Sequence, residues 1–192
     1  MHRHPNLEAV VLTDAHFLFT SPDGTEAKVD LPAGTPLYNE AAAHTVSNIG
    51  ETAGEVILVE LKADEDEHEE DGDEGHLEDG EHEEEGDDDV AVDPLLDSTV
   101  ADAERHTVVF ENDLIRVIRF DYAAGAQSNM HSHPEGVVIP LASGSALITL
   151  GDGTEIEAAL MAGEPYWTDA VVHKALNRSE SSIYGFGVEV KD

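Results

Sequence analysis

The chain of 192 residues contains no cysteine, which excludes disulfides and thiolate metal ligands. Basic residues are scarce too, since 9 Lys and Arg stand against 43 Asp and Glu and give a formal net charge of −34. Such a surface repels phosphate backbones and anionic lipids, so we expect neither nucleic acid nor a membrane as a partner. No apolar run reaches the length of a membrane helix, and residues 1–15 lack the layout of a signal peptide. We therefore expect a cytoplasmic protein, with export left open if the true start lies upstream.

Much of the negative charge lies in residues 64–89, a tract with 18 acidic residues and no Lys or Arg. A segment with almost no apolar side chains cannot bury enough surface to offset its ordering entropy. We therefore predict a disordered acidic linker there, which divides the chain into a domain at 1–63 and a domain at 90–192. His68, His76 and His82 lie inside the tract and could capture cations weakly, although a solvated tether is the simpler interpretation.

The two predicted domains are copies of one another. Residues 1–62 align with residues 130–191 without a gap, and about a third of the positions are identical, more than unrelated segments would share. Turn residues, apolar positions and histidines are retained together. The retained polar residues, each pair separated by 129 positions, include His2 and His131, His4 and His133, His44 and His173, and Asn48 and Asn177.

Short segments rich in β-branched residues occur at 55–61, 107–110, 114–120 and 146–150, and Gly-containing turns separate them. No long stretch has a helical period, so the pattern predicts an all-β sandwich or barrel. Only the second copy is preceded by extra strands, at 107–130. The first copy is therefore short of strands, which could come from an upstream start, from residues 90–102 or from another subunit, and this leaves a homodimer open.

The repeated histidines indicate a metal site. Alternate residues of a strand share a face, so His131 and His133 can close on one ion, with His173 as the third ligand from a neighbouring strand. The same argument applies to His2, His4 and His44. Imidazole sites without thiolate suit divalent Fe, Mn, Ni, Cu or Zn. A lone His-x-His pair is more often a surface or structural feature, but the joint repetition of three histidines favours metal binding.

These residues resemble the two motifs of the cupin superfamily. The resemblance rests on Gly125-x5-His131-x-His133, then Gly144, then Gly163-x-Pro165 and His173-x3-Asn177. It implies a double-stranded β-helix, or jelly-roll barrel, for residues 90–192 and a partial barrel for 1–63, so that the chain is similar to a bicupin with a truncated first barrel. Within the superfamily it is most similar to small bacterial cupins with a His-x-His-Pro motif.

The resemblance also implies a Glu ligand three or four residues beyond the second His. Glu8 has that spacing in the first copy, although a solvent-facing position is an equal alternative. Its counterpart in the second copy is Val137, and Glu135 comes too early, in the expected turn. The second site is therefore expected to hold its metal through three histidines alone, or with Glu135 or water in the remaining position.

Four further residues are candidates for the pocket or its surroundings. Tyr38 and Trp167 precede the third His of each copy and could line the pocket mouth, although a place in the barrel core is the commoner role. Asn48 and Asn177 are expected to secure the turn after that His, or to support the ligands. The resemblance implies a small-molecule substrate and a metal-dependent dioxygenase or isomerase. The alternative is a non-catalytic cupin that binds or senses a ligand, and the sequence identifies no catalytic residue.

Overall fold

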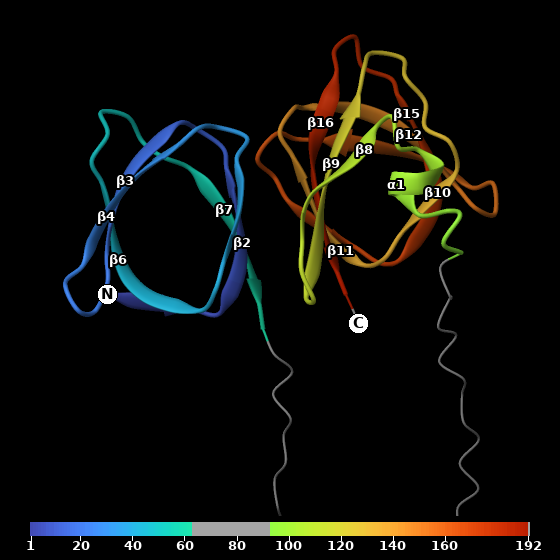
Figure 1. Ribbon diagram of the computed structural model, residues 1–192. Coiled ribbons are helices and arrows are strands. Elements are labelled where there is room, and N and C mark those ends of the chain that lie inside the picture. The colour runs from blue at the N-terminus through green and yellow to red at the C-terminus, as the bar shows by residue number, and fades with distance from the viewer. Residues whose placement is uncertain (63–92, 192) are drawn as a thin grey trace, which may run out of the picture.

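The computed structural model describes residues 1–62 and 93–191 and is almost entirely β-structure (Figure 1). The predicted linker at 64–89, with its three histidines, lies outside the described residues. Within the described parts of the chain, no helix is long and apolar enough to cross a membrane. Among the described residues the only helical element is α1 (Ser98–Ala101). It begins after Asp97, whose side chain accepts a hydrogen bond from the Thr99 amide.

The C-terminal half consists of two antiparallel sheets. A five-stranded sheet has the order β14-β11-β16-β9-β8, and a four-stranded sheet has the order β10-β15-β12-β13. This is the double-sheet barrel that the motifs predict. Its strands are β8 (His106–Glu111), β9 (Ile115–Tyr122), β10 (His131–His133), β11 (Gly136–Pro140), β12 (Gly144–Leu150), β13 (Glu155–Leu160), β14 (Tyr166–Thr168), β15 (Val171–Asn177) and β16 (Ile183–Val190).

The N-terminal half repeats this arrangement with two strands fewer. Its sheets have the orders β5-β2-β7 and β1-β6-β3-β4, and each strand has its counterpart 129 positions later. Nothing in the described part of this half corresponds to β8 and β9, so β7 has no partner along the edge where β9 pairs with β16. Its strands are β1 (His2–His4), β2 (Asn6–Val11), β3 (Ala15–Thr20), β4 (Glu26–Leu31), β5 (Pro36–Asn39), β6 (Ala42–Asn48) and β7 (Val56–Leu61).

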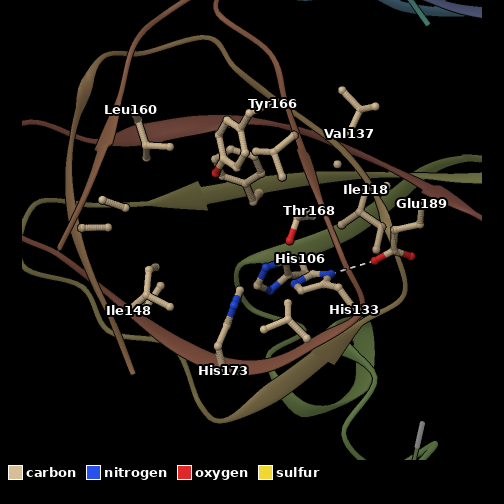
Figure 2. Close-up of a pocket in the computed structure, with 18 of the residues that line it drawn as sticks. His106, Ile118, His133, Val137, Ile148, Leu160, Tyr166, Thr168, His173 and Glu189 are labelled. Atoms are coloured by element: carbon tan, nitrogen blue, oxygen red, sulfur yellow. Dashed lines mark hydrogen bonds and ion pairs between the residues drawn. The ribbon is translucent and has the colours of Figure 1, made fainter. Parts of the chain in front are cut away.

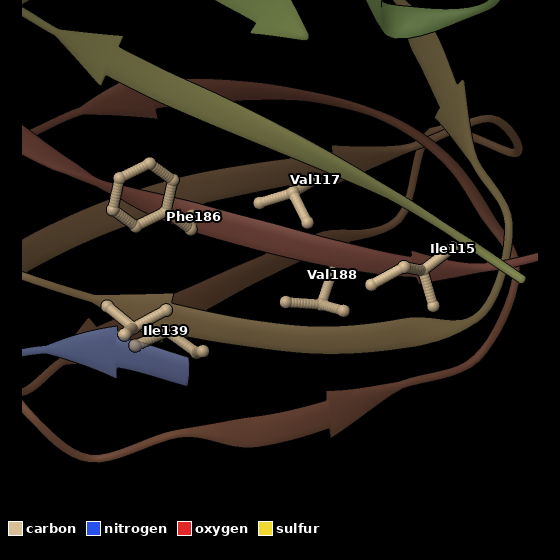
Figure 3. Packing of buried hydrophobic residues seen from close by; sticks show 6 residues of the cluster. Ile115, Val117, Ile139, Phe186 and Val188 are labelled. Atoms are coloured by element: carbon tan, nitrogen blue, oxygen red, sulfur yellow. The ribbon is translucent and has the colours of Figure 1, made fainter. Parts of the chain in front are cut away.

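The two halves pack against each other through the outer faces of two sheets, the three-stranded sheet of the first half and the five-stranded sheet of the second. Val10 of β2 is fully buried in one cluster with Ile115, Ile139, Phe186 and neighbouring side chains of the C-terminal half (Figure 3). Ile57, Val59 and Leu61 alternate along β7 and pack against the same cluster. Because such apolar side chains each contribute roughly 1.5–3 kcal/mol when buried, the partial barrel is stabilised by its contact with the complete one.

This contact is close to symmetric. Leu141 lies against Gly34, and Leu12 lies against Gly163, which are the same two positions exchanged between the copies. Both glycines have φ near +77°, a conformation that favours glycine. Tyr38 of the first half also stacks on Phe110 of the second, with the ring centroids 5.0 Å apart. The duplication is therefore visible in the contact between the halves as well as inside each half.

Candidate metal centre

Four imidazoles converge inside the C-terminal barrel. His131 pairs with His173 across β10 and β15, and their ring centroids are 4.7 Å apart. The His133 ring lies 4.8 Å from that of His131 and 5.5 Å from that of His173. The fourth ring belongs to His106 of β8, whose centroid is 4.6 Å from that of His131. Nitrogen atoms of His106, His131 and His133 lie within 4.8 Å of one another, so these side chains can share one ion.

His106 is the site residue that sequence reasoning missed. It comes from β8, well before the two motifs, and no spacing rule points to it. The register of β8 against β9 shifts between Val108 and Phe110, so that His106 and Val108 face the barrel interior while Phe110 faces the contact between the halves. Strict alternation along the strand would place His106 on the same face as Phe110, and the bulge reverses this.

Hydrogen bonds orient two of these rings. His131 Nδ1 lies 2.8 Å from the Asn129 carbonyl oxygen, and His133 Nδ1 lies 2.7 Å from Glu189 Oε1. In both rings Nδ1–H is therefore the donor, and Nε2 is left with a free lone pair. The Nε2 atom of His131 is buried and has no hydrogen-bond partner. A buried nitrogen without a partner, close to other imidazoles, fits the position of a metal ligand.

An ion-pair network lies behind His133. Glu189 Oε2 accepts from Arg116 at 2.6 Å, and Arg116 reaches Asp97 at 2.7 Å. Burial raises the pKa of Glu189 to about 7, and the Arg116 charge offsets only part of that rise. The network connects β16, β9 and the start of α1, so it holds the His133 ring at a fixed place in the barrel.

The imidazoles of this site are neutral at pH 7. Burial, together with the neighbouring rings, lowers the pKa of His133 to about 3 and that of His173 to about 3. Burial likewise lowers the pKa of His106 to about 3, and it also lowers the pKa of His131. Neutral imidazoles keep their lone pairs for a cation, because no proton has to leave before the ion binds.

The N-terminal half contains the matching triad. The ring centroids of His2, His4 and His44 are 4.8, 4.7 and 5.5 Å apart, the same three distances as in the second copy. His4 Nδ1 contacts Glu60 Oε1 at 2.7 Å, and Glu60 is the counterpart of Glu189. His2 is exposed and the other two are half-buried. The triads thus differ in burial and in the fourth imidazole, which the described part of this half does not supply.

Glu8 does not join the first triad, contrary to the expectation from its spacing. It pairs with Val59 on β7, whereas Leu7 pairs with Glu60. Residues paired across antiparallel strands share a face, so Glu8 and Val59 face the contact between the halves, and Glu60 faces the histidines. The Glu8 side chain is fully buried, and its carboxylate oxygens have no hydrogen-bond partner. Glu135 is exposed in the turn between β10 and β11, so the structure does not bring it to the second site.

Neither Tyr38 nor Trp167 lies at the pocket. Tyr38 packs at the contact between the halves, and Trp167 pairs with Val137 on the outer face of β11 and is 54% exposed. The adjacent residues Tyr166 and Thr168 line the pocket instead, because side chains alternate along β14.

The two asparagines hold turns. Asn177 donates to the Tyr122 and Ser181 carbonyl oxygens at 3.0 and 2.9 Å. Asn48 donates to the Thr52 carbonyl oxygen at 2.7 Å. Both side chains therefore fix the segment after the third histidine, and their amide groups make these contacts with the backbone.

A cavity of about 410 Å³ opens beside the second site. His106, His133, His173 and Glu189 lie at one end of it, and Ile148, Leu160 and Tyr166 lie toward the other (Figure 2). A cavity of this size accommodates a small molecule. A ligand in it would therefore have its polar end beside the imidazoles and its body against apolar side chains.

Comparisons with known proteins agree with this arrangement. No model of a protein family matches the chain. A segment of 87 residues, 44% of the chain, is 32% identical to the β-alanine degradation protein BauB of Pseudomonas aeruginosa and covers 90% of that protein. An oxalate decarboxylase variant from Bacillus subtilis aligns with 100% of this chain at a TM-score of 0.58 and 16% identity, and the chain spans 65% of its length. A cupin domain from Bordetella pertussis covers 45% of this chain and 92% of its own, with 25% identity and a TM-score of 0.43.

The duplicated double-sheet barrel and the repeated histidine motifs place the chain in the cupin superfamily, with the organisation of a bicupin. More particularly, it belongs to the family of BauB, whose length corresponds to about one of its two halves.

Proposed function

We propose that the C-terminal half binds a divalent transition-metal ion and acts with it, as an oxygenase or isomerase, on a small molecule held in the adjacent cavity. His106, His131, His133 and His173 are the proposed ligands. The observation that carries the proposal is the buried Nε2 atom of His131, which has no protein partner and lies among three further imidazoles.

An all-imidazole set suits Fe, Mn, Ni, Cu or Zn, and an ion bound there supplies Lewis acidity or, for iron and copper, activation of O₂. The protein's own groups do the remaining work. Glu189 accepts a hydrogen bond from the Nδ1–H of His133 and so leaves Nε2 free for the ion. Asn129 does the same for His131 through its carbonyl oxygen. The apolar walls keep bulk water from the bound molecule.

The first triad is the proposed second metal site. Its ring distances equal those of the second copy, but His2 is exposed and no fourth imidazole joins the triad within the described residues. An exposed ring is held less firmly by its surroundings than a buried one, so more ordering entropy opposes binding there. We therefore assign the principal metal to the second site and a weaker, exchangeable ion to the first.

The relatives do not decide the substrate. BauB is named for β-alanine degradation, and β-alanine carries a carboxylate. The cavity lining contains no Lys or Arg that could pair with such a group, whereas a bound divalent ion could, so the name of BauB does not assign β-alanine as the substrate of this chain. The likeness to oxalate decarboxylase, at 16% identity, concerns the fold alone.

The test combines metal analysis with a functional assay. Protein purified without a polyhistidine tag is stripped with chelator, reloaded with each candidate ion, and assayed for metal content and for O₂ consumption or isomerisation with a panel of small molecules. Glu189→Gln should weaken metal binding about 10- to 100-fold at the second site. Glu60→Gln, the matched change at the first site, should leave the second unaffected. Stable metal binding without turnover of any small molecule would favour the non-catalytic binder, and no metal binding at all would contradict the proposal.

A further inference from the structure

The cavity beside the imidazoles has a specific charge pattern. The residues that line it include three histidines and one acid, Glu189, but no lysine and no arginine. The nearest guanidinium in the network behind His133 is that of Arg116, which does not line the cavity and already pairs with Asp97 at 2.7 Å and Glu189 at 2.6 Å. An anionic group on a ligand would therefore meet no cationic side chain inside the cavity.

The walls away from the imidazoles are apolar. Ile118 of β9 and Val138 of β11 lie on one sheet, and Ile148 of β12 and Leu160 of β13 lie on the other. Figure 2 shows Ile148 and Leu160 on the side of the cavity away from Glu189. Placing a charge in such surroundings without a partner is strongly unfavourable, whereas an apolar body of matching size is stabilised by the surface it buries.

Few polar groups are available to a ligand besides the imidazoles. Glu189 is engaged with Arg116 and with His133. The hydroxyl groups among the lining residues belong to Tyr122, Tyr166 and Thr168, and the Tyr122 hydroxyl lies 3.5 Å from His106 Nε2. A neutral hydroxyl or carbonyl of a ligand can use these groups, because such contacts need no counter-charge.

We propose that this cavity selects a neutral, mostly apolar small molecule with a single polar end, and that it discriminates against anions. The molecule lies with its polar end toward the imidazoles and its body between Ile118 and Ile148. The proposal deepens the proposed function and rests on it for the role of the bound molecule. The selectivity itself arises from the cavity walls, so it is measured in metal-free protein, where no bound cation attracts the anionic probe.

The experiment compares two probes with the same ring system, the neutral 2-naphthol and the anionic 2-naphthoate. Each is titrated at pH 7 into metal-free protein, with the probe's fluorescence as the readout. We expect 2-naphthol to bind at least about tenfold more tightly, which corresponds to 1.4 kcal/mol. Equal or tighter binding of 2-naphthoate overturns the proposal. Binding of neither probe overturns it too, because a cavity that selects such ligands must admit one.

Variants test whether the cavity walls set the preference. Ile148→Lys places a cation inside the cavity and should shift the ratio at least tenfold toward 2-naphthoate. Ser145→Lys adds the same charge three residues earlier, on the exposed outer face of β12, and should leave the ratio unchanged. Equal shifts in both variants would contradict the proposal. Thr168→Lys, at another half-buried position of the lining, serves where circular dichroism shows that Ile148→Lys does not fold.

Metal binding is measured on the same preparations after they are reloaded with divalent ions. A protein that binds no metal but prefers 2-naphthol contradicts the proposed function and leaves the cavity selectivity standing. A protein that binds metal but prefers 2-naphthoate in the metal-free state contradicts the selectivity alone.

Discussion

Glu8 lies at the contact between the two halves, and its replacement by valine tests how that contact is held together. The side chain is fully buried, and neither carboxylate oxygen has a hydrogen-bond partner. Burial raises its pKa from 4.5 to about 7. Valine is the residue at the equivalent position 137 of the second copy, which packs against the same apolar cluster.

The sign of the pH effect follows from proton binding. Between pH 4.5 and about 7 the folded protein holds a proton on Glu8 that the unfolded chain has released, so stability falls as the pH rises through this window and then levels off. Since each pKa unit is worth 1.36 kcal/mol, the raised pKa of Glu8 destabilises the folded protein by about 3 kcal/mol at pH 8 and by about 1 kcal/mol at pH 5.

Glu8→Val removes this penalty, so its stabilising effect should be about 2 kcal/mol larger at pH 8 than at pH 5. The loss of side-chain volume is the same at both pH values and cancels in the comparison. The measurement is denaturant unfolding of both proteins at the two pH values, with circular dichroism as the signal. Glu51→Val, which removes an exposed charge from the same half, should show no such pH dependence. An effect of Glu8→Val that is independent of pH would refute the argument.

Two further variants probe the site and the contact between the halves. His106→Ala should reduce metal affinity at the second site about tenfold or more, since even groups behind a ligand act on that scale. Metal titrations measure this, with His16→Ala, on the exposed face of β3, as the control. Equal affinities of the two variants would exclude His106 as a ligand. Tyr38→Ala removes the ring that stacks on Phe110 and should lower the free energy of unfolding by about 2–3 kcal/mol. Trp167→Ala, which removes an exposed ring, should lower it by less than about 1 kcal/mol. A Tyr38→Ala effect no larger than that of Trp167→Ala would show that the stack contributes little.

The fold was predictable because the sequence contains an internal duplication that repeats its pattern. The 129-residue offset aligns turns, apolar positions and histidines, and the strands expected at 55–61, 107–110, 114–120 and 146–150 correspond to β7, β8, β9 and β12. The first half contacts the complete barrel through the shared apolar cluster. The contact is face to face and does not complete the β7 edge, which the missing strands were expected to cover.

The details of the site were less predictable because they depend on which face each strand presents. Glu8 has the spacing of a ligand, but its register with Val59 turns it away from the histidines. His106 has no motif, and a bulge in β8 turns it inward. Glu60 and Glu189 occupy equivalent places behind the second histidine of each copy, and their repetition at the same offset was a signal that could have identified them.

The central claim, that the second site holds the principal metal, is tested most directly by metal stoichiometry in two double variants of the full chain. His131→Ala with His133→Ala removes a buried and a half-buried ring, whereas His2→Ala with His4→Ala removes an exposed and a half-buried ring. We predict that the first pair abolishes tightly bound metal and that the second pair leaves most of it in place. Metal that survives the loss of His131 and His133 but not that of His2 and His4 would contradict the account.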